Sequence, residues 1–146
     1  MTAKNIKNQG FTLVELLIVI VIIAILTVVS LVAYNGLQNQ AKTSAAKSTV
    51  DSVAKKAELY NTEEGKYPDG IAKLTGADTK KSYYIAPANV TELGSDTFGS
   101  TTPTTTVKYE KCPGTGDPTG AKISYYDYSK NSIESRTVGT CPTPAP

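Results

Sequence analysis

A single carboxylate lies within the longest apolar stretch of this 146-residue chain. The stretch runs from Phe11 to Ala33 as FTLVELLIVIVIIAILTVVSLVA, and Glu15 is its one charged side chain. As a helix rising ~1.5 Å per residue, it would measure about 34 Å, enough to cross a hydrocarbon core of ~30 Å. An acidic side chain near the centre of such a span costs about 2.5–3.5 kcal/mol on insertion scales, and less near its end. A carboxylate placed at that cost is expected to have a function, so Glu15 is the first candidate functional residue.

The composition argues against most catalytic chemistry. The chain has no histidine, which disfavours imidazole catalysis and His-ligated metals, and its two cysteines are too few for a four-cysteine zinc site or an iron–sulfur cluster. No phosphate-binding loop, catalytic triad or pair of catalytic carboxylates is visible. The 15 basic and 13 acidic residues do not form a basic nucleic-acid footprint. We therefore expect no enzyme, no cofactor and no metal, and nucleic acid is a partner that the sequence permits but does not indicate.

The charges that flank the apolar stretch predict its orientation. Lys4 and Lys7 precede the stretch, and the next charge after it is Lys42. By the positive-inside rule the N-terminus stays in the cytoplasm and the rest of the chain is exported. A cleaved signal peptide would have an apolar region of ~7–15 residues and a small-residue cleavage site, and neither is found here. A plain signal anchor fits the length but does not explain Glu15.

The residues before and around Glu15 form the string Lys7-Asn8-Gln9-Gly10-Phe11-Thr12-Leu13-Val14-Glu15. This string resembles the class III signal sequence of type IV pilins and pseudopilins, in which a short basic leader, G-F-T-L-[IV]-E and an apolar helix follow one another. The resemblance covers the leader, residues 1–10, and essentially the whole apolar span. It implies cleavage between Gly10 and Phe11 by a membrane-embedded aspartic prepilin peptidase, followed by N-methylation of Phe11.

The same resemblance implies a role for Glu15 in subunit assembly. In that family the carboxylate at this position compensates the terminal amine of a neighbouring subunit, because a buried charge that is costly alone becomes tolerable when paired. The loss of Lys4 and Lys7 with the leader leaves 15 − 2 = 13 basic against 13 acidic side chains, so mature subunits would repel one another little. The implied partners are further copies of the chain in a helical homopolymer, membrane lipid before assembly and, indirectly, an inner-membrane assembly platform with its motor ATPase. The implied location is the cytoplasmic membrane before assembly and a cell-surface filament after it.

Beyond Ala33 the sequence becomes amphipathic. Apolar residues at mostly three- and four-residue steps, with one slip near Ser48, predict a buried helical stripe. The stripe comprises Tyr34, Leu37, Ala41, Ala45, Val50, Val53, Ala57 and Tyr60. Asp51 and Lys55 have the i,i+4 spacing of a helical ion pair. The helix is expected to end between Asn61 and Gly65, and a continuous helix over 11–62 would be roughly 75 Å long.

The exported domain, 65–146, is expected to be β-rich. Gly65-Lys66-Tyr67-Pro68 is similar to the G-x-Y-P often seen in major pilins and pseudopilins. A helical turn is predicted over 71–74, and strands are predicted over 82–86, 104–112, 122–128 and 133–138, the last two joined as a hairpin by a four-residue loop. The predicted fold class is thus α+β, a pilin fold: a long N-terminal helix, with a transmembrane half (11–33) and an amphipathic half (34–64), packed on a small antiparallel sheet.

Both cysteines, Cys112 and Cys141, lie in this exported domain, where a disulfide is permissible. A disulfide closing about 30 residues would stabilise the domain by roughly 3.5 kcal/mol on the loop-entropy model. It would be similar to the C-terminal disulfide loop of many pilins. The alternative is two free thiols.

Three functions compete on this sequence: a structural subunit of a type IV pilus (a fimbrium), a pseudopilin of a type II secretion system, and an anchored enzyme or receptor. Major pseudopilins commonly lack the C-terminal disulfide and carry calcium, so Cys112 and Cys141 favour the pilus subunit. A minor or competence pilin that binds DNA lies between the first two. It would need basic residues gathered on one face, for which the candidates are Lys108, Lys111, Lys122, Lys130 and Arg136.

Overall fold

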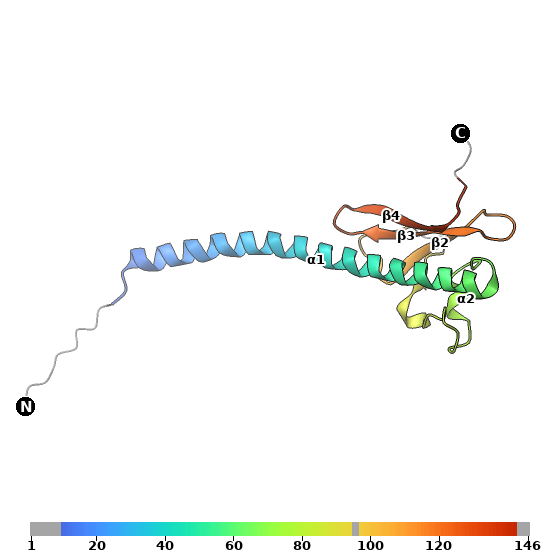
Figure 1. The fold of residues 1–146 in the computed structure, drawn as a ribbon. Coiled ribbons are helices and arrows are strands. Elements are labelled where there is room, and N and C mark those ends of the chain that lie inside the picture. The colour runs from blue at the N-terminus through green and yellow to red at the C-terminus, as the bar shows by residue number, and fades with distance from the viewer. Residues whose placement is uncertain (1–9, 95–96, 143–146) are drawn as a thin grey trace, which may run out of the picture. The chain divides into compact units, whose positions relative to one another are not determined.

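The computed structural model describes residues 10–94 and 97–142, so most of the expected leader (1–9) and the last tail residues (143–146) lie outside the described residues. The elements in chain order are α1 (Leu13–Glu64), α2 (Ala72–Thr75), a 3-10 turn (Pro87–Asn89), β1 (Thr91–Glu92), β2 (Thr106–Cys112), β3 (Gly120–Asp127) and β4 (Ser132–Gly139) (Figure 1). The long N-terminal helix and the mostly antiparallel sheet confirm the predicted α+β class.

The chain divides into two compact units after Leu37. In the first unit, every described side chain is exposed, and α1 contains an 18-residue window with a mean hydropathy of 3.4. By length and composition this part of α1 could cross a membrane. The second unit contains the rest of α1, the sheet and the core.

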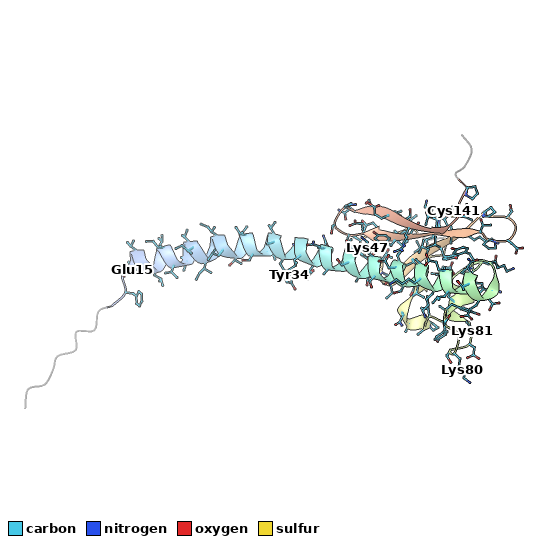
Figure 2. All side chains as sticks on the ribbon, in the orientation of Figure 1. Glu15, Tyr34, Lys47, Lys80, Lys81 and Cys141 are labelled. Carbon is cyan, nitrogen blue, oxygen red and sulfur yellow. A yellow bond between two sulfur atoms is a disulfide. The ribbon has the colours of Figure 1, made fainter. Side chains whose placement is uncertain are left out.

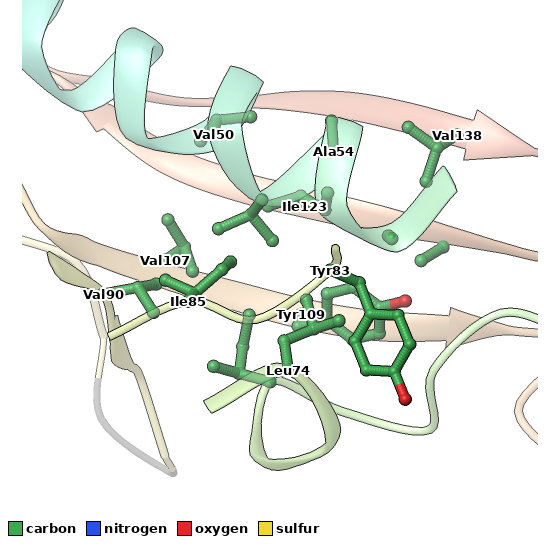
Figure 3. Close-up of a cluster of buried hydrophobic side chains, with 14 residues drawn as sticks. Val50, Ala54, Leu74, Tyr83, Ile85, Val90, Val107, Tyr109, Ile123 and Val138 are labelled. Atoms are coloured by element: carbon green, nitrogen blue, oxygen red, sulfur yellow. The ribbon is translucent and has the colours of Figure 1, made fainter. Parts of the chain in front are cut away.

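The core of the second unit lies between α1 and the sheet (Figure 3). It combines residues of α1, of the loops after it and of the strands, namely Val50, Val53, Ala54, Ala57, Ile71, Leu74, Tyr83, Ile85, Val90, Val107, Tyr109, Ala121, Ile123 and Val138. Leu74, Val107 and Ile123 are completely buried. Each buried branched side chain of this kind contributes about 1.5–3 kcal/mol relative to exposure, so this layer holds the unit together.

The predicted buried stripe of the helix is only half right. Val50, Val53 and Ala57 are buried and Tyr60 is half-buried, but Tyr34, Leu37, Ala41 and Ala45 are exposed. The step from Ala45 to Val50 is five residues, which at ~100° per residue turns the side chain by about 140° away from the line of the stripe. The residues before and after that step therefore face opposite sides of the helix.

The sheet has the order β1-β2-β3-β4, with β1 parallel to β2 and the other pairs antiparallel. The hairpin prediction is confirmed with a shift of one residue, because β3 and β4 are joined by the four residues 128–131. The predicted helical turn and the 104–112 strand are confirmed as α2 and β2. The strand predicted over 82–86 is wrong: Tyr83 and Ile85 are buried in alternation, but they lie in a loop. The one backbone hydrogen bond from this loop to α2 runs from the Ile85 N–H to the Leu74 carbonyl, over 3.1 Å.

The end of α1 is fixed to the sheet by the G-x-Y-P segment. Gly65 takes a left-handed φ of 77° and its N–H donates to the Asn61 carbonyl over 2.9 Å, which closes the last helical turn. The Tyr67 N–H then donates to the Pro118 carbonyl over 3.1 Å. The Tyr67 ring lies against Gly139, where a Cβ would sit only 2.6 Å from the ring, so no side chain fits at Gly139.

The last helical turn carries Glu63 and Glu64 and no basic residue. These negative charges are unfavourable there, because the C-terminal end of a helix dipole is itself negative. The loop after α2 compensates these charges. Lys81 Nζ lies 3.5 Å from a carboxylate oxygen of each glutamate, and the Tyr83 hydroxyl donates to Glu64 over 2.8 Å. A hydrogen bond from the Ser82 hydroxyl lowers the pKa of Glu63.

Candidate functional site

Glu15 lies at the start of α1 (Figure 2). There it takes part in a reciprocal cap with Thr12. The backbone N–H and the hydroxyl of Thr12 both donate to Glu15 Oε2, over 2.8 and 2.7 Å, and the Glu15 N–H donates to Thr12 Oγ over 3.2 Å. This is a capping box, which satisfies N–H groups that a helix start leaves without partners and places a negative charge at the positive end of the helix dipole. This role of Thr12 is not among the sequence predictions, although the pattern Thr-x-x-Glu before an apolar run is its signal.

Gly10 and Phe11 immediately precede this cap. Both residues are outside the helix and exposed, and Phe11 is 90% exposed. Apart from Gly10 itself and its two chain neighbours, no heavy atom of the described residues lies within 4 Å of the position that a Cβ on Gly10 would take. The Gly10–Phe11 bond is thus in open, non-helical chain two residues before α1.

Large apolar side chains cover the first half of α1. Those between Phe11 and Leu37 are between 48% (Val21) and 90% (Phe11) exposed. Exposed apolar surfaces of this extent mark sites where a membrane or another protein provides the cover. The structure therefore gathers Gly10, Phe11 and Glu15 at the start of a surface that this unit does not bury itself.

The disulfide prediction is confirmed: Cys112 and Cys141 are bonded, with a Cα–Cα distance of 4.9 Å. The bond joins the end of β2 to the residues that follow β4. Thr119 reinforces the closed loop, because its N–H donates to the Cys112 carbonyl over 2.8 Å and the Thr140 N–H donates to the Thr119 carbonyl over 3.0 Å.

Most of the basic residues considered for DNA binding have acidic partners. Lys108 pairs with Glu110 (3.2 Å), Lys111 with Asp69 (3.0 Å), Lys130 with Glu134 (3.0 Å), and Arg136 with Asp51. The pairing of Asp51 with Arg136 replaces the i,i+4 pair with Lys55 that the sequence suggested. The remaining candidate, Lys122, is exposed and lies opposite Glu110 in the β2–β3 register.

The described residues also contain no group of three or more His, Cys, Asp or Glu side chains arranged to hold a metal ion.

Two family models match the chain. The prokaryotic N-terminal methylation motif matches residues 5–31, which include Gly10, Phe11 and Glu15. The model described as "Type II secretion system (T2SS), protein G" matches residues 33–109, more than half of the chain. The chain belongs to the type IV pilin and pseudopilin family. Members of this family are structural and non-enzymatic, which confirms the expectation that the chain is not an enzyme.

Two curated relatives of this pilin-family chain are major pilus proteins. The chain is 34% identical over 80 residues to the type IV major pilin protein PilA of Myxococcus xanthus. That alignment covers 55% of this chain and 36% of the relative. It is 35% identical over 83 residues to the type IV wide pilus major component PilA4 of Thermus thermophilus, covering 57% of this chain and 60% of the relative. The alignments thus span less than two thirds of either relative. No solved structure matches the chain.

Proposed function

We propose that this chain is a structural subunit of a type IV pilus, cut by a prepilin peptidase after Gly10 and polymerised through its N-terminal helix. The observation that carries this proposal is the full exposure of α1 from Leu13 to Leu37 in a single chain. Before assembly, membrane lipid covers this surface and the N-terminus stays inside. After assembly, the helices of other subunits cover it in a filament on the cell surface.

Processing and pairing follow from the residues at the start of α1. Cleavage after Gly10 makes Phe11 the new N-terminus, which is then N-methylated. Thr12 uses only Oε2 of Glu15, so Oε1 can accept a hydrogen bond from the terminal amine of a neighbouring subunit. That pairing offsets the cost of a carboxylate among apolar helices and fixes the register of the subunits. The assembly platform and motor ATPase act indirectly, by lifting the subunit out of the membrane.

Two further observations bear on the class of filament. The Cys112–Cys141 disulfide and the two major pilus relatives support a major pilin. The match to the type II secretion protein G model supports a second candidate, a pseudopilin of a type II secretion system. The acidic partners of Lys108, Lys111, Lys130 and Arg136 count against a minor or competence pilin that binds DNA through this sheet.

Cell fractionation tests the proposal. Cells that produce the chain are sheared, and the sheared and membrane fractions are probed with an antibody against the exported domain. We expect the processed chain in the sheared filaments. The Gly10→Leu variant is the matched control, and it should remain in the membrane fraction at precursor length. Processed chain that stays in the membrane and never enters the sheared fraction would favour the pseudopilin instead.

A further inference from the structure

A groove of about 390 Å³ lies within the second unit, between α1 and the segment 84–90. Its volume falls in the range of about 300–1,000 Å³ that is typical of small-molecule sites. Ser48 and Ser52 line the wall formed by α1, and Tyr84 and Asn89 line the opposite wall. Ser48, Ser52 and Asn89 are exposed, so solvent-borne ligands meet polar side chains first.

Three neutral side chains of this groove have unused hydrogen-bonding capacity. The Ser52 hydroxyl donates to the Ser48 carbonyl over 3.0 Å. The side chains of Ser48, Tyr84 and Asn89, by contrast, form no hydrogen bond with another described residue. Hydroxyl and carboxamide groups can each donate and accept hydrogen bonds. A ligand that carries several hydroxyl groups, which have the same double capacity, therefore matches both walls.

Lys56 gives the groove a positive charge and is the one charged residue among those that line it. Its Nζ donates to the Ser82 carbonyl, which leaves further N–H donors of the ammonium group for a ligand. Within the described part of the chain Lys56 forms no ion pair, since Glu63, which also contacts Ser82, pairs with Lys81 over 3.5 Å. The groove therefore favours a ligand with a carboxylate, because hydrogen bonds between ionised groups are the stronger ones.

The buried side chains of Val53, Ile85 and Val90 add apolar surface between the two walls (Figure 3). Sugars combine C–H surface with closely spaced hydroxyl groups, and a uronic acid adds one carboxylate to each ring. We propose that this groove is a binding site for an acidic saccharide of the uronic acid class. The site goes beyond the proposed polymerisation, because all of its lining residues belong to the second unit.

Isothermal titration calorimetry on the full chain tests the site, in a zwitterionic detergent that has no sugar headgroup. The probe is trigalacturonate. Its fully methyl-esterified form is the matched ligand, because the ester keeps the hydroxyl groups but loses the negative charges. We expect trigalacturonate to bind about tenfold more tightly than the ester, which is the size of effect expected from one charge-assisted hydrogen bond.

Two substitutions separate the charge from the neutral groups. Lys56→Gln should weaken trigalacturonate binding about tenfold and leave binding of the ester nearly unchanged. Lys55→Gln is the matched control, because Lys55 is the adjacent exposed lysine and does not line the groove. It should leave both affinities unchanged. Asn89→Ala should weaken both ligands by a similar factor, because it removes neutral hydrogen bonds, and its exposed position makes the fold insensitive to the change.

Three results would overturn the inference: no binding of either ligand at millimolar concentration, equal affinities for the acid and the ester, or equal losses from Lys55→Gln and Lys56→Gln. The last result would mean that trigalacturonate is attracted by the general positive charge of the helix and not by the groove. The titration uses single chains in detergent, so it does not depend on whether cells assemble filaments. Failure of the pilus proposal and failure of this site are therefore distinguishable.

Discussion

Asp127 is expected to be the most sensitive polar residue of the β3–β4 hairpin. Its Oδ1 accepts hydrogen bonds from the Ser129 N–H (2.9 Å), the Lys130 N–H (3.1 Å) and the Thr43 hydroxyl of α1 (3.0 Å). The residue is only 5% exposed. The carboxylate therefore holds the hairpin turn in shape and ties it to the helix. We predict that Asp127→Ala destabilises the chain far more than any neighbouring surface substitution.

The expected magnitude follows from these bonds. A hydrogen bond to an ionised acceptor contributes about 1.5–3 kcal/mol. The Ser129 N–H retains Thr43 Oγ as a second acceptor at 3.1 Å, which reduces the loss. We therefore expect Asp127→Ala to lower the free energy of unfolding by about 3 kcal/mol, and Asp127→Asn, which keeps an acceptor oxygen, by about 1 kcal/mol. Glu134→Ala is the matched control on the same hairpin, because its exposed pair with Lys130 is worth under about 1 kcal/mol.

The dependence of this effect on pH has a definite sign. Although burial acts to raise the pKa of Asp127, hydrogen bonds from Thr43 and the turn N–H groups outweigh it and hold the pKa below its usual value. The folded state therefore binds a proton at Asp127 less readily than the unfolded state does. The stabilisation is fully present above the unfolded pKa of ~3.9 and is lost as the pH falls through the lower folded value.

Urea unfolding of the mature chain in detergent, followed by tyrosine fluorescence, measures these differences. The gap between the unsubstituted chain and Asp127→Ala should be constant from about pH 5 to 8 and shrink below about pH 4. An Asp127→Ala variant as stable as Glu134→Ala, or a gap that persists unchanged at the lowest pH, would refute the reasoning.

Three further predictions concern Glu15, the Cys112–Cys141 disulfide, and Gly139, whose position leaves no space for a side chain. Glu15→Ala should leave cleavage after Gly10 intact but reduce the yield of sheared filaments, and a normal yield would contradict the pairing role. The double variant Cys112→Ser/Cys141→Ser should unfold in urea with a free energy about 3.5 kcal/mol lower, since the disulfide closes a separation of 29 residues; equal stability would argue against a structural bond. Gly139→Ala should lower the melting temperature clearly, because φ is 66° there and a Cβ would meet backbone at 2.4 Å. Gly114→Ala, with no neighbour within 4 Å, serves as its control and should melt like the unsubstituted chain.

The sequence was sufficient for the parts of the fold that rest on local patterns. The apolar run and its flanking turn signals predicted α1, and the alternation on either side of 128–131 predicted the hairpin. The sequence was not sufficient where contacts distant in the chain decide the outcome. The pairing of Asp51 with Arg136 and the approach of Tyr67 to Gly139 join segments that no local pattern connects. The break in spacing near Ser48 is visible in the sequence, but the sheet decides that the residues after it are buried and those before it are exposed.

The functional residues show the same division. Gly10, Phe11 and Glu15 can be identified from the sequence because they lie in one short string, 10–15. Their roles in cleavage, methylation and assembly stay predictions. The cap formed by Thr12 can be predicted from its spacing to Glu15, since Thr-x-x-Glu before an apolar run is the pattern of a capping box.

Intact-mass and peptide mass spectrometry of filaments sheared from the cell surface tests the central claim most directly. The account predicts a dominant subunit that begins at Phe11, carries one additional methyl group on that terminus, and is two hydrogens lighter because of the Cys112–Cys141 bond. A chain that begins at Met1, or filaments in which this chain is absent, would contradict it.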